Sequence, residues 1–240
     1  MPENQRPSSS EPLATEAELT TGEVTILGRI EASSNGALLV ELESGHLGVY
    51  KPASLERPLW DFTAGLFRRE RASYVLARQL GLDFIPPIVI RDDLPLGRGS
   101  LQSFIDANFD LHYFELYGEP DLRDRFIEIA AFDLVANNAD RKAGHLLLDQ
   151  GRHLWGIDNA LCFHAEPKLR TVIWEFGGAP ITQELLDAMT HAADNLNSEF
   201  TQLLSQRERR TLVHRLRVVA SMRELIDLDV DERPYPWPLI

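Results

Sequence analysis

The chain has 240 residues, of which 44% are hydrophobic and 25% charged, a composition typical of a soluble globular protein. This excludes a largely disordered, collagenous or fibrous chain. Lys and Arg number 24 against 37 Asp and Glu, which gives a formal net charge of −13. Such an acidic chain is repelled by phosphate backbones and anionic bilayers at long range, so we expect no general nucleic-acid binding and no attachment to membranes by bulk charge.

The single cysteine, Cys162, excludes an internal disulfide and a cysteine-rich zinc site. No apolar run reaches the roughly 18 residues needed to cross a bilayer, so we expect no integral membrane association. Residues 1–19 are rich in Pro, Ser and Glu and lack the apolar stretch of a signal peptide. We therefore expect a cytoplasmic protein.

The first part of the chain predicts a disordered tail, residues 1–21, followed by a small β-rich lobe over residues 22–100. Three strand-like runs form a predicted meander, and Asn35-Gly36 in its first turn is a strong hairpin signal. A helix that ends before Gly81 and a further strand-like run follow. The elements expected in this lobe span residues 24–30, 37–42, 47–51, 65–80 and 84–90.

The second part predicts a mostly helical lobe over residues 101–226 and a proline-rich acidic tail over 227–240. Asp121 is expected to cap its first helix. Two strand-like runs joined by a turn follow, and then three helical stretches. These elements span residues 121–136, 145–148, 153–157, 181–194, 196–205 and 207–226. The predicted fold class is therefore α+β, with two lobes and a cleft between them.

Polar side chains gather at the two ends of the predicted hairpin in the second lobe. Asp140 and His145 precede it, and Asp158 follows it, 18 residues after Asp140. A hairpin brings its ends together, so these three side chains should converge, and convergent carboxylates beside an imidazole suit a divalent metal with phosphate oxygens. Taken separately, each segment could equally be an ordinary turn.

The first lobe offers a lysine and a carboxylate. Lys51 ends the third strand and Glu70 lies early in the following helix, the pairing that protein-kinase-like folds use to hold a lysine on nucleotide phosphates. The turn at Ser33, Ser34 and Asn35 could present backbone N–H groups to phosphate. Alternatively, Lys51 is a solvated lysine at the end of a strand. Glu70 would then be an exposed member of the run of charged residues at 68–71.

In this order the residues resemble the phosphatidylinositol 3-/4-kinase-like branch of the kinase fold, especially the type II phosphatidylinositol 4-kinases and an uncharacterised actinobacterial family related to them. Three segments carry the resemblance: GSLQSFI at 99–105, NADR at 138–141 and IDNALCF at 157–163. They are similar to the hinge that meets adenine, the catalytic loop and the metal-binding segment. The catalytic-loop pattern is also similar to that of HipA-like bacterial kinases.

The resemblance implies a bilobal protein-kinase-like fold and a role for each matching residue. Lys51 would bind the α- and β-phosphates of ATP and catalyse transfer, and Glu70 would orient it. Leu101 and Gln102 would border adenine. The remaining two roles fall to aspartates, with Asp140 meeting the acceptor hydroxyl and Asp158 holding Mg²⁺ or Mn²⁺.

Two departures from the family pattern bear on activity. His145 stands where these kinases usually place a metal-binding Asn, so the resemblance makes it the second candidate metal ligand beside Asp158. A neutral imidazole can bind a metal ion, yet it suits Mg²⁺ less well than an oxygen ligand does. A preference for Mn²⁺, a single metal ion and loss of activity all remain open. The cysteine-rich, acylated insertion of the type II lipid kinases has no counterpart here, which argues against a phosphoinositide substrate.

The sequence therefore predicts an ATP-dependent phosphotransferase acting on a protein or a small molecule. The alternatives are a nucleotide-binding pseudokinase that regulates a partner, and a metal-dependent phosphoesterase that uses Asp140, His145 and Asp158. A group of arginines in the last predicted helix is interpreted as a solvated face, with a docking site for substrate or partner as the alternative. These are Arg207, Arg209, Arg210, Arg215, Arg217 and Arg223.

Overall fold

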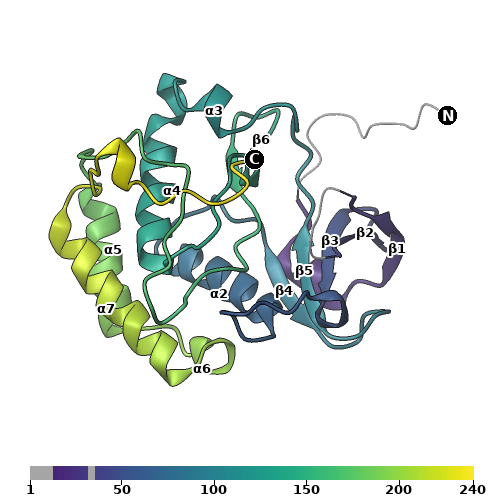
Figure 1. The fold of residues 1–240 in the computed structure, drawn as a ribbon. Helices are drawn as coiled ribbons and strands as arrows, with labels where there is room; N and C mark the ends of the chain where they lie inside the picture. The colour runs from purple at the N-terminus through teal and green to yellow at the C-terminus, as the bar shows by residue number, and fades with distance from the viewer. Residues whose placement is uncertain (1–12, 32–35) are drawn as a thin grey trace.

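The computed structural model describes residues 13–31 and 36–240. An N-terminal lobe built on a sheet lies beside a helical C-terminal lobe (Figure 1). The N-terminal lobe comprises α1 (Glu16–Thr21), β1 (Val24–Arg29), β2 (Leu38–Leu42), β3 (Leu47–Pro52), α2 (Leu66–Gln79), β4 (Ile88–Arg91) and β5 (Gly99–Ser103). The C-terminal lobe comprises α3 (Tyr113–Leu116), α4 (Arg123–Ala136), β6 (Leu146–Leu148), β7 (Leu154–Gly156), α5 (Gln183–Asp194), α6 (Phe200–Leu203) and α7 (Gln206–Met222).

The sheet of the N-terminal lobe has the order β1-β2-β3-β5-β4, and all its neighbouring strands are antiparallel. The predicted meander is confirmed by β1, β2 and β3, while the turn residues Ser33, Ser34 and Asn35 lie outside the described residues. Lys51 pairs with Ser100 across β3 and β5, and Tyr50 pairs with Leu101. Because side chains alternate along a strand, these two pairs face opposite sides of the sheet.

Helix α2 confirms the predicted helix over residues 65–80. It begins after Gly65, whose φ of 100° lies in the left-handed region that glycine adopts without strain. The free N–H groups at its start are capped by a residue outside the helix. The Glu56 side chain accepts hydrogen bonds from the N–H groups of Gly65 and Phe67 at 2.8 and 3.0 Å. Two charged residues of α2, Arg69 and Glu70, are buried. Buried charges are found almost only with polar partners, so this helix makes specific polar contacts as well as apolar ones.

Helix α4 runs through the core of the C-terminal lobe, where apolar side chains on several of its faces are buried. The predicted cap at Asp121 is wrong. Residues Pro120–Leu122 form a 3₁₀ turn, α4 begins at Arg123, and the Asp121 carboxylate accepts a hydrogen bond from Arg152 at 2.8 Å. The predicted pair of short strands is confirmed by the β6–β7 hairpin.

Helix α1 corrects the prediction that the tail is disordered as far as residue 21. Thr15 and Glu18 form a capping box at its start, and Leu19 is fully buried in the core of the N-terminal lobe. Capping and one buried leucine therefore order a short, otherwise polar segment. The rest of that prediction, over residues 1–12, lies outside the described residues.

The C-terminal segment returns to the centre of the molecule and ends beside the polar segment that follows α4 (Figure 1). Its backbone accepts hydrogen bonds from the N–H groups of Thr171 and Ala143, at Pro234 (3.2 Å) and Leu239 (2.8 Å). Trp237 in this segment is 88% exposed. Backbone hydrogen bonds therefore hold this segment in place.

Candidate active site

Lys51 joins the two lobes through two carboxylates. It lies on β3, and its ammonium donates to Glu70 of α2 and, at 3.0 Å, to Oδ1 of Asp158, which follows β7. The Glu70 side chain is 2% exposed and the Asp158 side chain 37% exposed. The structure thus brings together three residues that lie far apart in the sequence and leaves one open side, at Asp158.

The ionisation states of Lys51, Glu70 and Asp158 depend on one another. Burial alone would lower the pKa of Lys51, but the carboxylates of Asp158 and Glu70 outweigh it and raise that pKa, which keeps the ammonium charged. Lys51 holds the pKa of Asp158 well below its usual range, so Asp158 is ionised. Burial raises the pKa of Glu70, and Lys51 opposes this rise.

Glu70 is held in place from both lobes. The hydroxyl of Ser100 on β5 donates to Glu70 Oε2 at 3.2 Å. The neighbouring Arg69 donates to the carbonyl of Cys162 at 2.6 Å and to Glu208 of α7. Arg71 donates to Glu199, ahead of α6, at 2.7 Å. Helix α2 is therefore anchored to the C-terminal lobe on both sides of Glu70.

A buried ion pair organises the polar segment after α4. Arg141 and Asp133 of α4 are both completely buried and are joined by hydrogen bonds of 3.0 Å. Arg141 also donates to the carbonyl of Ile157 at 3.1 Å and to the side chain of Asn159 at 2.6 Å. These two residues flank Asp158, so one guanidinium links α4, the polar segment and the segment that carries Asp158.

Asp140 is fixed by the same arrangement. Its N–H donates at 3.0 Å to the side chain of Asn138, which in turn donates at 2.9 Å to Asp133. Its carboxylate lies 3.4 Å from the ammonium of Lys142. Burial raises the pKa of Asp140 to about 6, against the opposing effect of Lys142. The Asp140 pKa is thus closer to neutral pH than that of an ordinary Asp.

His145 meets Asp158 from the other side of the hairpin, with 3.5 Å between His145 Nε2 and Asp158 Oδ2. Its Nδ1 accepts a hydrogen bond from the N–H of Lys142 at 3.3 Å. Burial lowers the pKa of His145 to about 4, so the ring is neutral near pH 7. A neutral ring that accepts at Nδ1 carries its proton on Nε2, which therefore faces Asp158 as a donor.

The donors at this site fit a metal ion only in part. Within residues 13–31 and 36–240, no group of three or more His, Cys, Asp and Glu side chains could by itself hold a metal ion. The ionised Asp158 is a suitable oxygen ligand for Mg²⁺ or Mn²⁺, and it lies in left-handed backbone with φ 54°. Nucleotide phosphates would have to complete the coordination shell, as they do where Mg²⁺ is bound with ATP.

The two predicted adenine-contacting residues face opposite sides of the sheet. Leu101 is fully buried in the core of the N-terminal lobe together with Tyr50. Gln102 pairs with Val49 and therefore shares the face that carries Lys51. Its Oε1 is buried and has no hydrogen-bond partner among the residues that the structure describes, so it is an acceptor available to a ligand. Ser33, Ser34 and Asn35 lie outside those residues.

Sequence reasoning missed the residues that hold the site together, Asp133, Asn159 and Ser100. A detectable signal existed for Asp133, because it is an acidic residue inside the apolar stretch IAAFDLVA of the helix before the polar segment. Such a residue needs a buried cationic partner, and Arg141 is eight positions away.

Comparison with solved structures defines the fold class. The Golgi casein kinase with Mn/ADP bound matches with a TM-score of 0.60 and 12% identity over 94% of this chain and 79% of that chain. Hydra Fam20 with sugar matches with a TM-score of 0.58, 14% identity and 86% of each chain. The Helicobacter pylori proinflammatory kinase CtkA matches with a TM-score of 0.51 and 10% identity over 86% of this chain and 94% of that chain. The predicted α+β, bilobal, protein-kinase-like fold is confirmed.

The sequence comparison places the chain in a family. Protein Rv2133c of Mycobacterium tuberculosis is 36% identical over 265 residues, which cover 92% of this chain and 94% of that protein. The chain belongs to the family of Protein Rv2133c. No protein-family model matches it. Of the helices in the described ranges, none has the length and apolar character required to cross a bilayer.

Replacing Asp133 by Ala should lower the free energy of unfolding by about 3–5 kcal/mol, because it leaves Arg141 charged, buried and unpaired. Urea denaturation monitored by circular dichroism measures this loss. Asp121→Ala, which removes the exposed partner of Arg152, is the matched control and should leave the midpoint almost unchanged. Equal, small shifts for the two variants would show that the Asp133–Arg141 pair does not organise this lobe.

Proposed function

We propose that the chain is an ATP-dependent phosphotransferase that transfers the γ-phosphate to a hydroxyl group. The observation that carries the proposal is the position of Lys51, which bridges a buried Glu on α2 and an ionised Asp after the β6–β7 hairpin. A kinase-like fold uses this set of residues to hold nucleotide phosphates and the metal that accompanies them.

The geometry supports the binding roles that the resemblance implies. Lys51 would contact the α- and β-phosphates, with Glu70 fixing its ammonium. Asp158 would hold Mg²⁺ or Mn²⁺ together with phosphate oxygens. That ion, when bound, would neutralise charge that develops on the transferred phosphoryl group. Gln102, whose side-chain oxygen has no hydrogen-bond partner among the described residues, would border the base.

Asp140 would meet the acceptor hydroxyl. Its backbone is fixed by Asn138, and its raised pKa makes it a better proton acceptor than an ordinary carboxylate. The acceptor proton would pass to an Asp140 carboxylate oxygen as the hydroxyl oxygen forms its bond to the γ-phosphorus and the bond to the leaving ADP oxygen breaks. Lys142 is close enough to stabilise the ionised form of Asp140 before transfer.

The choice of acceptor rests on resemblance. The hinge, catalytic-loop and metal-segment motifs support a place in the phosphatidylinositol 3-/4-kinase-like branch. The missing cysteine-rich insertion disfavours a lipid, and one structurally similar protein is a casein kinase. We therefore propose a protein or small-molecule acceptor in the cytoplasm.

Three substitutions should separate nucleotide binding from chemistry. Lys51→Ala and Asp158→Asn should weaken metal-dependent ATP binding, because each removes a group that holds the phosphates or the metal. Asp140→Asn should keep ATP binding and lower the transfer rate by about 10²–10⁴, the usual contribution of a positioned base. Calorimetry and an ATP-consumption assay on the same proteins measure both.

Other outcomes of that experiment would select a different function. A parent chain that binds ATP and consumes none would favour the pseudokinase. Hydrolysis that continues unchanged in Lys51→Ala would indicate the metal-dependent phosphoesterase, which has no use for this lysine. Loss of ATP binding in Asp140→Asn with retention in Asp158→Asn would reverse the two assigned roles.

The raised pKa of Asp140 predicts the pH dependence of transfer. Only the ionised carboxylate accepts a proton, so kcat should fall as the pH decreases through about 6, whereas an ordinary Asp would keep its charge to about pH 4. The measurement is kcat against pH at saturating ATP. Asp140→Asn is the control that removes effects from the titration of ATP itself. A parent profile parallel to that of the variant between pH 5 and 7 would contradict the assignment.

We further propose that His145 positions Asp158 instead of binding the metal. Binding through Nε2 would require the proton to move to Nδ1, which would break the hydrogen bond from Lys142. His145→Asn should therefore leave the ratio of Mn²⁺-supported to Mg²⁺-supported activity within about twofold of the parent, although KM for ATP rises. A clear shift of the ratio toward Mg²⁺ would make His145 a metal ligand.

A further inference from the structure

The structure divides the arginines of α7 into two groups. Arg207 pairs with Glu166, Arg215 donates to the carbonyl of Val135 at 2.7 Å, and Arg217 lies 3.1 Å from Asp194. Arg209 and Arg210 form no ion pair with any residue in the described ranges.

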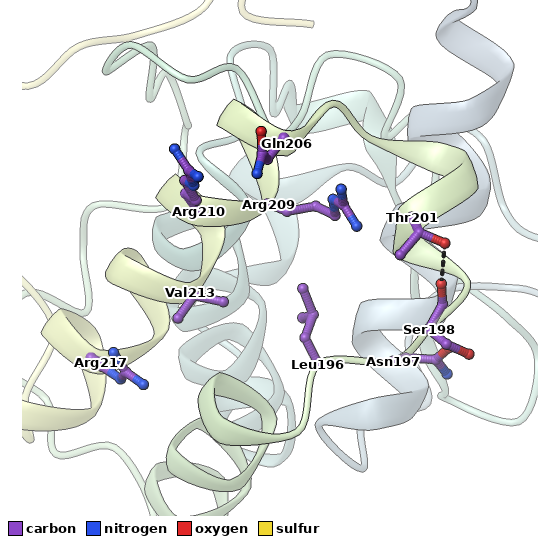
Figure 2. A pocket seen from close by; sticks show the side chains of 9 residues that line it. All are labelled: Leu196, Asn197, Ser198, Thr201, Gln206, Arg209, Arg210, Val213 and Arg217. Carbon is purple, nitrogen blue, oxygen red and sulfur yellow. Dashed lines mark hydrogen bonds between the residues drawn. The ribbon is translucent and has the colours of Figure 1, made fainter.

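These two arginines line a hollow of about 560 Å³ between α7 and the segment that runs from the end of α5 into α6 (Figure 2). Arg209 extends from α7 across the hollow toward Ser198 and Thr201, and Leu196 points into the same space. Residues of α7 spaced by three or four positions form one wall of the hollow. That wall consists of Gln206, Arg209, Arg210, Val213 and Arg217.

The chemistry of the hollow is that of an anion site. None of the described residues that line it carries a carboxylate, and besides Arg209, Arg210 and Arg217 its polar groups are the neutral side chains of Asn197, Ser198, Thr201 and Gln206. The Nε of Arg209 is buried and has no hydrogen-bond partner in the described part of the chain, so this donor is unsatisfied until a ligand accepts from it. Planar guanidinium groups match the oxygens of a phosphate, which can accept two parallel hydrogen bonds.

We propose that this hollow binds a phosphate monoester, either on a phosphorylated serine of a peptide or on a small phosphorylated molecule. It is a second site, separate from the one that contains Lys51. A phosphate-sized anion would accept a hydrogen bond from Arg209 Nε and a second one from Arg210. The side chains of Asn197, Ser198 and Thr201 on the opposite wall would donate further hydrogen bonds.

The position of the hollow connects it to helix α2. The segment that forms its second wall is hydrogen-bonded to the C-terminal end of α2. Gln79 donates to the carbonyl of Asn195 at 2.7 Å and accepts from the N–H of Asn197 at 3.2 Å. Glu199 on the same segment binds Arg71, next to Glu70. An occupant of the hollow should therefore alter ATP affinity through α2, a consequence that rests on the proposed function.

Calorimetric titration of the full chain tests the site. The probes are inorganic phosphate, glucose 6-phosphate, a short phosphoserine peptide and the same peptide without phosphate. Replacing Arg209 and Arg210 together by Gln should weaken binding of at least one phosphorylated probe by about tenfold or more, since two charged hydrogen-bonding groups are lost. Arg207→Gln, the same change on an exposed, already paired arginine of α7, should alter it by less than about twofold.

The outcomes separate this site from the proposed active site. Phosphate-probe binding that survives Lys51→Ala and is lost in the double Arg variant supports the hollow whether or not the chain is a kinase. A preference for the phosphopeptide over glucose 6-phosphate identifies the source as protein, and the reverse preference identifies a small molecule. Equal binding in the double variant, or no binding of any phosphorylated probe to the parent, overturns the proposal. Unchanged ATP affinity with the bound probe overturns only the connection through α2.

Discussion

The ion pair between Asp133 and Arg141 is the constraint on which the site depends. Two opposite charges are removed from water completely, which is favourable only when hydrogen bonds satisfy both groups. Arg141 meets this requirement by donating to the segment on both sides of Asp158, and Asp133 by accepting from Asn138, which fixes Asp140. The two aspartates of the site are therefore positioned by one buried pair that takes no part in the proposed chemistry.

Helix α2, which contacts both lobes, positions Glu70 and through it Lys51. Its buried face presents Glu70 to Lys51, and the arginines on either side bind Glu208 and Glu199 of the C-terminal lobe. The lysine then reaches Asp158 across the junction of the lobes. Nucleotide phosphates would have to compete with Asp158 for Lys51. Glu199, which precedes α6, and Glu208 of α7 are thus the contacts that tie this arrangement to the C-terminal lobe.

Local patterns in the sequence were sufficient to predict much of this. Strand-like runs and the Asn-Gly turn signal predicted the meander, and a hairpin with polar residues at both ends predicted that Asp140, His145 and Asp158 converge. Local patterns did not show which side chains are buried or which face of the sheet they occupy. Leu19 is ordered by a core that forms from distant strands, and the opposite facing of Leu101 and Gln102 depends on a register that only strand pairing defines. The His145 ring accepts one backbone hydrogen bond, from Lys142, and no sequence pattern encodes this contact.

The central claim is that Lys51, Glu70 and Asp158 form a site for ATP with a divalent metal. Isothermal titration of the parent chain with ATP tests it most directly, in the presence of Mn²⁺, of Mg²⁺ and of neither ion. The account predicts saturable binding at the Lys51 site that strengthens markedly when a divalent ion is present, because Asp158 and the phosphates would share the ion. Absence of binding under all three conditions would contradict it, and so would binding that the metal ions leave unchanged.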